Sequence, residues 1–306
     1  MEMVAVDSVV IFRSLIAMTS VVLAVVSLGQ AEPPNESAKA YRDRILIWQK
    51  SIQADLETPE GWLSVAGLTW LNEGDNSIGC ASKNRIILPT SAGTPIAGNL
   101  LLRSGTVTFQ AQAGTNSKFK GKVVNQMPIQ PDEDRIQTGG IIWMIIQRGK
   151  RIGVRMYDPN GRARKEFRGC KWYPVNPQYR VTAKYTEYLV PKSMPITNVL
   201  GDTQPVSNPG YVTFQIDGRE CRLEAQAAGK GLFFNFRDNT SGKTTYPAGR
   251  FLDASGPVNN EVVLDFNQAT NPPCAFTSFA TCPLPPTENY LSVSIPAGEK
   301  THHPAD

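Results

Sequence analysis

Histidine is almost absent from this 306-residue sequence: only His302 and His303 occur, both at the carboxyl end. A Ser-His-Asp triad or a Cys-His pair needs a histidine beside its nucleophile, and many zinc sites use histidine nitrogens as ligands. The body of the chain therefore lacks a histidine-dependent nucleophile and a histidine-based metal cage. We expect no metal site and no cofactor.

Charge is also scarce. Charged residues make up 19% of the chain, below the average of about 25%, and 31 basic against 27 acidic residues leave a net charge of only +4. So small an excess does not by itself indicate nucleic-acid binding, and we expect none. With 25 glycines and 23 prolines, the composition excludes long disorder and coiled coil, and favours many short elements joined by turns.

The one strongly apolar stretch, Leu15–Leu28, is short for a membrane-spanning helix, which needs about 20 apolar residues. Arg13 precedes it, and Gly29-Gln30-Ala31 places small residues where a signal peptidase cleaves. We therefore predict that residues 1–31 are a signal peptide cleaved near Ala31. The mature protein would be exported to the periplasm or the extracellular space, with no stable membrane span. A retained anchor is the alternative, because Glu2 and Asp7 weaken the positive charge of the leader.

Five cysteines are an odd number, so at least one is unpaired or bonded to another molecule. Only seven residues separate Cys274 from Cys282, and we expect a disulfide that staples this loop. Two buried thiols, thiolate metal ligands, or a nucleophile activated by Arg250 are the alternatives. The other three cysteines are interpreted as small buried hydrophobic residues: Cys80, Cys170 and Cys221.

One segment has helical periodicity. Its apolar residues recur at steps of three and four, which predicts an amphipathic helix beginning at Ala38 and ending at Thr58-Pro59-Glu60-Gly61. The apolar positions are Tyr41, Ile45, Trp48, Ile52 and Leu56.

From Gly61 onward the apolar residues follow the period of two that is typical of strands. Asp217-Gly218 tolerates the positive φ angles of a type I′ turn and predicts a hairpin. The fold is therefore predicted to be mainly β, a sandwich or partly closed barrel of antiparallel strands with one N-terminal amphipathic helix. The expected strands are 100–102, 106–109, 141–147, 152–157, 211–216, 219–225, 232–236, 244–246, 262–266 and 291–295.

Two prolines between β stretches mark a boundary at Trp172–Pro177. We expect residues 36–175 to form a lobe with the helix and a β-sandwich, and residues 176–306 to form a second β lobe. One continuous body with a crossover at this point is the alternative.

Several segments between Tyr41 and Lys300 form a recognisable pattern. They are Gly61–Leu71, Phe236–Gly242 with Thr245-Tyr246 and Gly249-Arg250, Leu264–Asn267, Asn271–Phe276, Thr281–Pro286, Asn289 and Ala297–Lys300. Together they resemble the largely bacterial family known as domain of unknown function 1684, and the resemblance implies a shared fold and a shared site without any established reaction.

A second resemblance covers only residues 75–125. Asn76–Gly79 with Asn84–Pro89 is similar to the opening strands of a forkhead-associated β-sandwich. Those domains hold phosphothreonine through an arginine after the glycine and a later Ser-x-x-His. Cys80 follows Gly79 here and no histidine precedes His302, so the likeness implies fold and not phosphopeptide binding.

Five polar side chains lie in the part of the chain that is rich in proline, asparagine and glycine, and we expect them to line a ligand pocket. An arginine can clamp a carboxylate or phosphate with two hydrogen bonds, and a carboxylate ending an apolar strand can have a shifted pKa. The predicted ligand is a small anionic or polar molecule. Arg250 is the anion clamp, Asp265 and Glu299 are polar partners, and Asp238 and Tyr246 lie at the rim.

Three other interpretations remain open for this region. Asp265 can instead cap a turn at Asn267 while Arg250 neutralises it, which would be a structural ion pair. A hydrolase-type enzyme could use Asp265 or Glu299 as a base without histidine. The protein could also be a purely structural envelope module.

Nine of the 24 residues from Arg148 to Lys171 are basic, and aromatic residues lie among them. Such a stretch could bind an anionic envelope polymer, given the predicted export. A solvated hairpin and loop is the alternative.

Overall fold

A computed structural model of the chain describes residues 36–302, which divide into two compact units. Unit 1 comprises residues 36–49, 170–272 and 283–301, and unit 2 comprises residues 50–169, 273–282 and 302. The units are therefore interleaved along the chain, whereas the expected lobes, 36–175 and 176–306, are consecutive. The predicted signal peptide lies outside the described residues. Within residues 36–302, no helix is both long enough and apolar enough to span a membrane.

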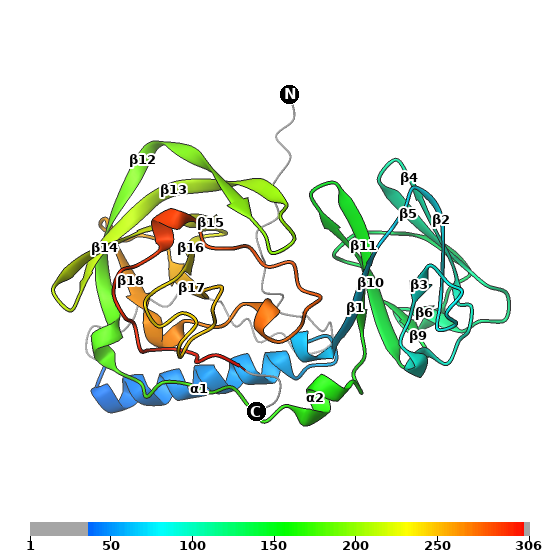
Figure 1. Cartoon of the computed structure of the whole chain (residues 1–306), viewed down its shortest axis with the longest axis horizontal. Helices are drawn as coiled ribbons and strands as arrows, with labels where there is room; N and C mark the ends of the chain where they lie inside the picture. The colour runs from blue at the N-terminus through cyan, green and yellow to red at the C-terminus, as the bar shows by residue number, and fades with distance from the viewer. Residues whose placement is uncertain (1–35, 303–306) are drawn as a thin grey trace, which may run out of the picture. The chain divides into compact units, whose positions relative to one another are not determined.

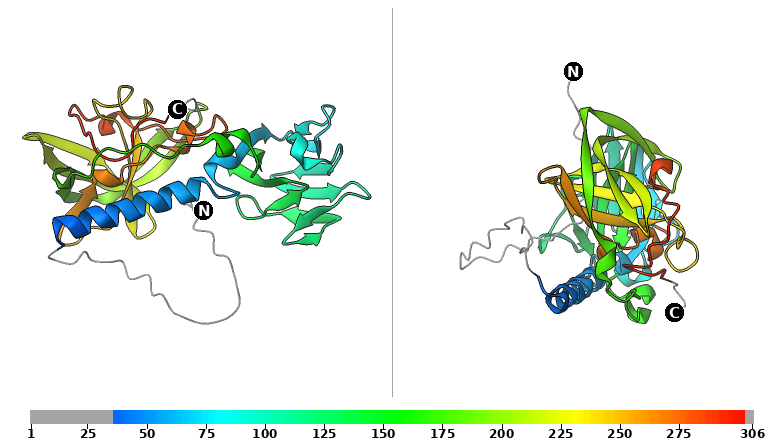
Figure 2. Two further views of the ribbon diagram at one scale, coloured as in Figure 1. Left: turned by 90° about the horizontal axis from the view of Figure 1, so that it is seen from below. Right: turned by 90° about the vertical axis from the view of Figure 1, so that its left-hand side faces the viewer.

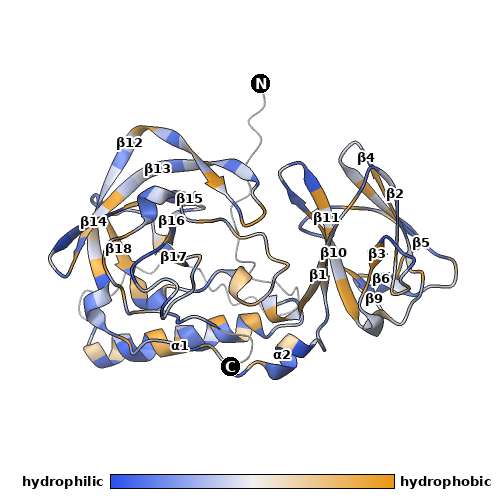
Figure 3. Cartoon of the chain, viewed as in Figure 1, coloured by the Kyte–Doolittle hydropathy of each residue, from blue (hydrophilic) through white to orange (hydrophobic). Residues whose placement is uncertain are grey.

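The predicted amphipathic helix is present as α1 (Ala38–Leu56), a single continuous helix (Figures 1 and 2). Hydropathy colouring shows apolar and polar residues alternating around its turns (Figure 3). Tyr41, Ile45 and Leu56 are buried, as the spacing predicts. The helix ends before Gly61, where a Cβ would collide with the carbonyl oxygen of Leu56, so only glycine fits this turn.

Unit 2 contains two sheets, with strand orders β1-β11-β10-β9-β6-β7 and β3-β2-β4-β5-β8. The predicted hairpins around Ser104-Gly105 and Gly149 are confirmed as β4–β5 and β10–β11. The core of the unit includes Trp143 and Phe109, whose rings meet edge to face at 5.2 Å. The strands are β1 (Val65–Trp70), β2 (Gly74–Gly79), β3 (Ile86–Ile87), β4 (Gly98–Arg103), β5 (Thr106–Ala111), β6 (Ser117–Phe119), β7 (Lys122–Val123), β8 (Gln126–Ile129), β9 (Ile136–Thr138), β10 (Ile141–Arg148) and β11 (Arg151–Tyr157), followed by the short helix α2 (Arg162–Glu166).

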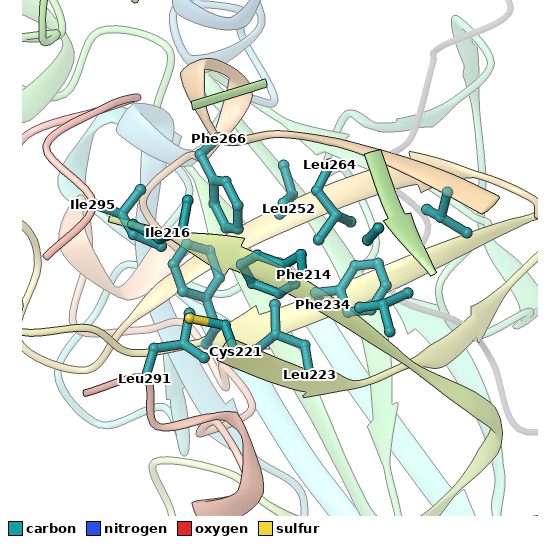
Figure 4. Packing of buried hydrophobic residues seen from close by; sticks show 14 of the residues in the cluster. Phe214, Ile216, Cys221, Leu223, Phe234, Leu252, Leu264, Phe266, Leu291 and Ile295 are labelled. Carbon is teal, nitrogen blue, oxygen red and sulfur yellow. The ribbon is translucent and has the colours of Figure 1, made fainter. Parts of the chain in front are cut away.

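Unit 1 contains a four-stranded sheet of order β14-β13-β12-β18 and a three-stranded sheet of order β15-β16-β17. The predicted Asp217-Gly218 turn joins β13 to β14 with φ angles of 50° and 72°, as a type I′ hairpin requires. The inner faces of both sheets form one apolar core, in which Phe214, Phe234 and Phe266 lie together (Figure 4). The strands are β12 (Arg180–Thr197), β13 (Thr203–Ile216), β14 (Arg219–Glu224), β15 (Gln226–Ala228), β16 (Gly231–Phe236), β17 (Arg250–Ser255) and β18 (Glu261–Asp265).

Two of the predicted strands are wrong. Leu291, Val293 and Ile295 are buried alternately, as in a strand, but their segment forms no ladder. Its backbone bonds a loop instead, for example from the Asn239 N–H to the Val293 carbonyl at 2.8 Å. Residues 244–246 form a turn with a single bridge, between Ser241 and Thr245.

The predicted fold class is confirmed. The described residues are mainly β and contain no closed barrel, and all strand pairs are antiparallel except β2 with β3. The protein is thus a sandwich-like β structure with one long helix near its N-terminus.

Candidate functional site

Arg250 and Asp238 form a buried ion pair in unit 1. Arg250 begins β17, and its Nη2 donates to Asp238 Oδ2 at 2.8 Å, with side-chain exposures of 1% and 0%. The same nitrogen donates to the Ile295 carbonyl at 3.0 Å, and Nη1 donates to the Ala297 carbonyl. Burial lowers the pKa of Arg250, and the neighbouring carboxylate opposes that shift. Both terminal nitrogens of the guanidinium therefore already donate hydrogen bonds to acceptors within the protein.

Asp238 is equally well satisfied. Its Oδ2 also accepts the Ile295 N–H at 3.0 Å, and its Oδ1 accepts the Thr240 N–H at 2.9 Å and the Thr240 hydroxyl at 2.5 Å. The structural alternative named Asp265 as the partner of Arg250, whereas the structure pairs Arg250 with Asp238. A buried ion pair whose atoms all find partners tethers segments of the chain, here β17 to the residues around Ile295.

Asp265 caps the turn at Asn267, as one alternative predicted: its Oδ1 accepts the Asn267 N–H at 3.1 Å. Its carboxylate also accepts the Tyr41 hydroxyl, at 2.9 Å and 3.0 Å to the two oxygens. The Asn267 side chain donates to the same hydroxyl at 2.9 Å. Burial raises the pKa of Asp265, and these hydrogen bonds oppose that shift. Asp265 thus fastens α1 to the end of β18.

Unlike Asp238 and Asp265, Glu299 is buried with incomplete hydrogen bonding. It is 1% exposed, and its Oε2 accepts the Asn271 N–H at 2.7 Å, while its Oε1 has no hydrogen-bond partner among the described residues. The side chain of Asn271 donates to the Lys300 carbonyl at 2.8 Å, yet its Oδ1 is also buried and has no partner within residues 36–302. Two neighbouring residues therefore each present an unsatisfied acceptor oxygen, which is costly in a protein interior.

Burial raises the pKa of Glu299 to about 7, although hydrogen bonds from Asn271 and the Cys170 side chain, and the charge of Arg250, oppose the shift. A carboxyl in this range changes its charge near neutral pH, which suits proton transfer. Cys170, which contacts Glu299, is itself half-buried.

The structure thus brings three of the five predicted residues, Arg250, Asp238 and Glu299, into one electrostatic neighbourhood. Asp265 belongs to the separate Tyr41 network. Tyr246 is half-buried in the turn before β17, and its carbonyl accepts the Gly249 N–H at 3.1 Å. A surface depression of about 380 Å³ in unit 1 is lined by none of the five.

The structure shows no disulfide among the five cysteines, all of which lie within the described residues, so the expected Cys274–Cys282 bond stays a prediction. Cys274 lies in a 3-10 turn (Pro273–Ala275), where its N–H points at Cys282 and donates to Sγ at 3.1 Å. The two thiols are also hydrogen-bonded to each other. The short loop thus places the sulfur atoms side by side without a covalent bond. Within residues 36–302, no group of three or more His, Cys, Asp or Glu could hold a metal ion.

Sequence reasoning missed Asn271 and Cys170 as neighbours of Glu299, because no local pattern shows which backbone group a buried carboxyl meets. It also missed Arg155, which is buried in unit 2 near the cysteine pair. That residue gave a signal: it interrupts the apolar strand Ile152–Tyr157, and charged residues are rarely buried without a reason.

Fold and site together define a sandwich-like β protein with a buried, unsatisfied carboxyl near the end of its chain. Residues 165–300 match the family described as "Protein of unknown function (DUF1684)" and belong to it. The solution NMR structure of an uncharacterized protein from Haloarcula marismortui is 34% identical, with 45% of this chain and 79% of that chain covered and a TM-score of 0.39. A search of curated proteins found no match. The forkhead-associated likeness stays a prediction.

Proposed function

We propose that the protein binds a small polar ligand in the C-terminal part of unit 1, at Glu299 and Asn271. The observation that carries this proposal is the pair of unpartnered, buried oxygens, Glu299 Oε1 and Asn271 Oδ1. Buried acceptors normally have donors, and those left without one within the chain are candidates for bonds to a ligand.

The charges of the region favour a ligand that donates hydrogen bonds. Arg250, the predicted anion clamp, already binds Asp238 and two carbonyl oxygens, so an anionic ligand would find no uncommitted guanidinium there. Acceptor oxygens and a carboxyl with a pKa of about 7 suit an amine, an amide or a hydroxyl compound. The half-buried Cys170, which contacts Glu299, would lie at the entrance.

A second candidate function is catalysis with Glu299 as the base. Its raised pKa favours proton transfer near neutral pH, whereas the carboxylate oxygens of Asp265 are occupied by Tyr41 and Asn267. Of the two carboxylates considered from the sequence, Glu299 is therefore the better base. The leader pattern from Arg13 to Ala31 supports the further proposal that the protein acts after export.

The test is a thermal-shift screen of wild-type protein against small primary amines, amides, sugars and carboxylates. Glu299→Gln replaces the acceptor, and Glu288→Gln, at an exposed glutamate of the same C-terminal segment, is the matched control. We expect at least one amine, amide or sugar to raise the melting temperature of wild type and the control but not of Glu299→Gln. Compounds that stabilise all three proteins equally would place binding elsewhere, and a response to carboxylates alone would contradict the proposed ligand class.

A further inference from the structure

Arg155 is a buried cation without a matching anion. It lies on β11 in unit 2 and is 4% exposed, and its Nε and Nη2 have no hydrogen-bond partner among the described residues. Its guanidinium carbon lies 4.9 Å from the centre of the Trp62 ring, a cation–π contact that satisfies no N–H. Asp132 acts on Arg155 only weakly and is paired with Arg148 at 3.0 Å.

A buried guanidinium is costly unless a negative charge compensates it. The residues that can supply such a charge lie in the same unit, on the segment 273–282. This segment is held to the β1 region by the Thr277 hydroxyl, which donates to the Val65 carbonyl at 3.5 Å. It carries Cys274, which is half-buried, and Cys282, which is 5% exposed.

The pKa values of the two thiols are shifted in opposite directions. This is the difference expected between an attacking cysteine and the second cysteine that resolves the mixed disulfide. The hydrogen bond from Cys282 and the charge of Arg155 lower the pKa of Cys274, although burial opposes them. Burial and the adjacent Cys274 raise the pKa of Cys282. Cys274 is also the more exposed of the two residues, so a substrate disulfide reaches its sulfur before that of Cys282.

We propose that Cys274, Cys282 and Arg155 form a thiol–disulfide exchange site in unit 2, whose substrates are disulfides of small molecules or proteins. Cys274 is the attacking thiolate, Cys282 resolves the mixed disulfide, and Arg155 stabilises the thiolate. This site is independent of Glu299 and of the ligand proposed there.

The reaction runs in two balanced steps. The Cys274 thiolate attacks one sulfur of R–S–S–R′, which forms a mixed disulfide with R and releases R′S⁻. The negative charge on Cys274 is then gone, so Cys282 loses its proton more readily, here to R′S⁻. The Cys282 thiolate attacks the Cys274 sulfur and releases RS⁻, which takes a proton from solvent. The chain's two thiols are oxidised to one disulfide, and the substrate disulfide is reduced to two thiols.

The first test uses the aromatic disulfide 5,5′-dithiobis(2-nitrobenzoate) on the full chain at neutral pH, with the modified cysteine identified by peptide mass mapping. Wild type should release two thionitrobenzoate ions per chain in its fast phase and keep no adduct on Cys274. Cys282→Ser should release one and retain the mixed disulfide on Cys274, and Cys274→Ser should lose the fast phase. Cys80→Ser, at another half-buried cysteine, is the control and should behave as wild type.

The second test addresses Arg155. Arg155→Met should slow the alkylation of Cys274 by iodoacetamide severalfold at neutral pH, because loss of the cation raises the pKa of Cys274 and lowers the fraction of thiolate. Arg151→Met, at an exposed position on the same strand, should leave the rate unchanged. An unchanged rate in a folded Arg155→Met chain would overturn the role of Arg155. A fast phase that maps to Cys80 or Cys170 would overturn the whole site, and this outcome does not depend on whether Arg155→Met folds.

Discussion

Within residues 36–302, each of the two units buries one arginine, and the two side chains have very different hydrogen-bond partners. Arg250 in unit 1 has an acid at 2.8 Å and carbonyl oxygens on both terminal nitrogens. Arg155 in unit 2 is almost as deeply buried but leaves Nε and Nη2 without partners among the described residues. Burial lowers the pKa of both, and a carboxylate opposes the shift strongly only at Arg250.

The difference indicates that Arg250 has a structural role, whereas Arg155 is a candidate for a chemical one. A buried cation with every donor satisfied is explained by the fold that it holds together. A buried cation with two donors that no described residue satisfies is a candidate for a chemical role instead. The same contrast separates the carboxyls of unit 1, since Asp238 is fully bonded whereas Glu299 has one oxygen without a partner.

The largest effect is expected from breaking the satisfied pair. Asp238→Ala should lower the free energy of unfolding by about 3–5 kcal/mol, because it leaves the Arg250 charge buried and uncompensated. Denaturant unfolding measures this loss, with Glu220→Ala on the exposed face of β14 as a control within about 0.5 kcal/mol of wild type. A loss below about 1 kcal/mol for Asp238→Ala would show that the pair is not structural.

The next effect concerns the unsatisfied carboxyl and depends on pH. The pKa of Glu299 rises from 4.5 to about 7 on folding, so the folded chain binds more protons between these values and loses stability as pH increases through them. Below pH 4.5 this penalty is absent, and above pH 7 it reaches about 3 kcal/mol. Glu299→Gln cannot ionise and should therefore gain stability over wild type as pH increases from 4.5 to 8.

Urea unfolding of both proteins across this pH range measures that gain. Glu288→Gln, which removes an exposed carboxyl from the same segment, should follow the wild-type curve within about 0.5 kcal/mol at every pH. Parallel curves for wild type and Glu299→Gln would contradict the raised pKa and, with it, the proposed base.

A smaller effect is expected at the junction of α1 with β18. Tyr41→Phe removes the hydroxyl that Asp265 and Asn267 share, and should lower the free energy of unfolding by about 1–3 kcal/mol because it leaves buried polar groups with fewer bonds. Calorimetric or denaturant melts measure this, with the exposed Tyr290→Phe as control. Equal stability of the two variants would mean that the Asp265 network does not anchor the helix.

The fold was predictable where local chemistry decides it. The spacing from Tyr41 to Leu56 predicts α1, and Asp217-Gly218 predicts its hairpin, because helix periodicity and positive φ angles are properties of neighbouring residues. The segment 291–295 was mistaken for a strand because alternate burial does not require a ladder; its partners are loop residues near Arg237 and Asn239.

The site was predictable only in part, because partners distant in sequence decide what a charged side chain does. The sequence indicated Arg250 and Glu299, yet their roles depend on Asp238 and Asn271, which the fold brings to them. For the cysteines, loop length correctly predicted that Cys274 and Cys282 meet, but it does not show whether their sulfur atoms are bonded. Arg155 was missed, although a charged residue inside an apolar strand is a signal that the sequence contains.

Replacing each arginine by methionine compares the two side chains directly. The smallest change in the free energy of unfolding is expected at Arg155. Arg250→Met should cost about 3–5 kcal/mol, since it leaves Asp238 buried without its counter-ion. Arg155→Met should change the free energy of unfolding by no more than about 1 kcal/mol in either direction, because it exchanges a desolvated, unpaired charge for an apolar chain of similar length. Both are measured by denaturant unfolding at the same pH. If Arg155→Met proved as costly as Arg250→Met, the charge of Arg155 would be structural, and its electrostatic effect on Cys274 would need no chemical explanation.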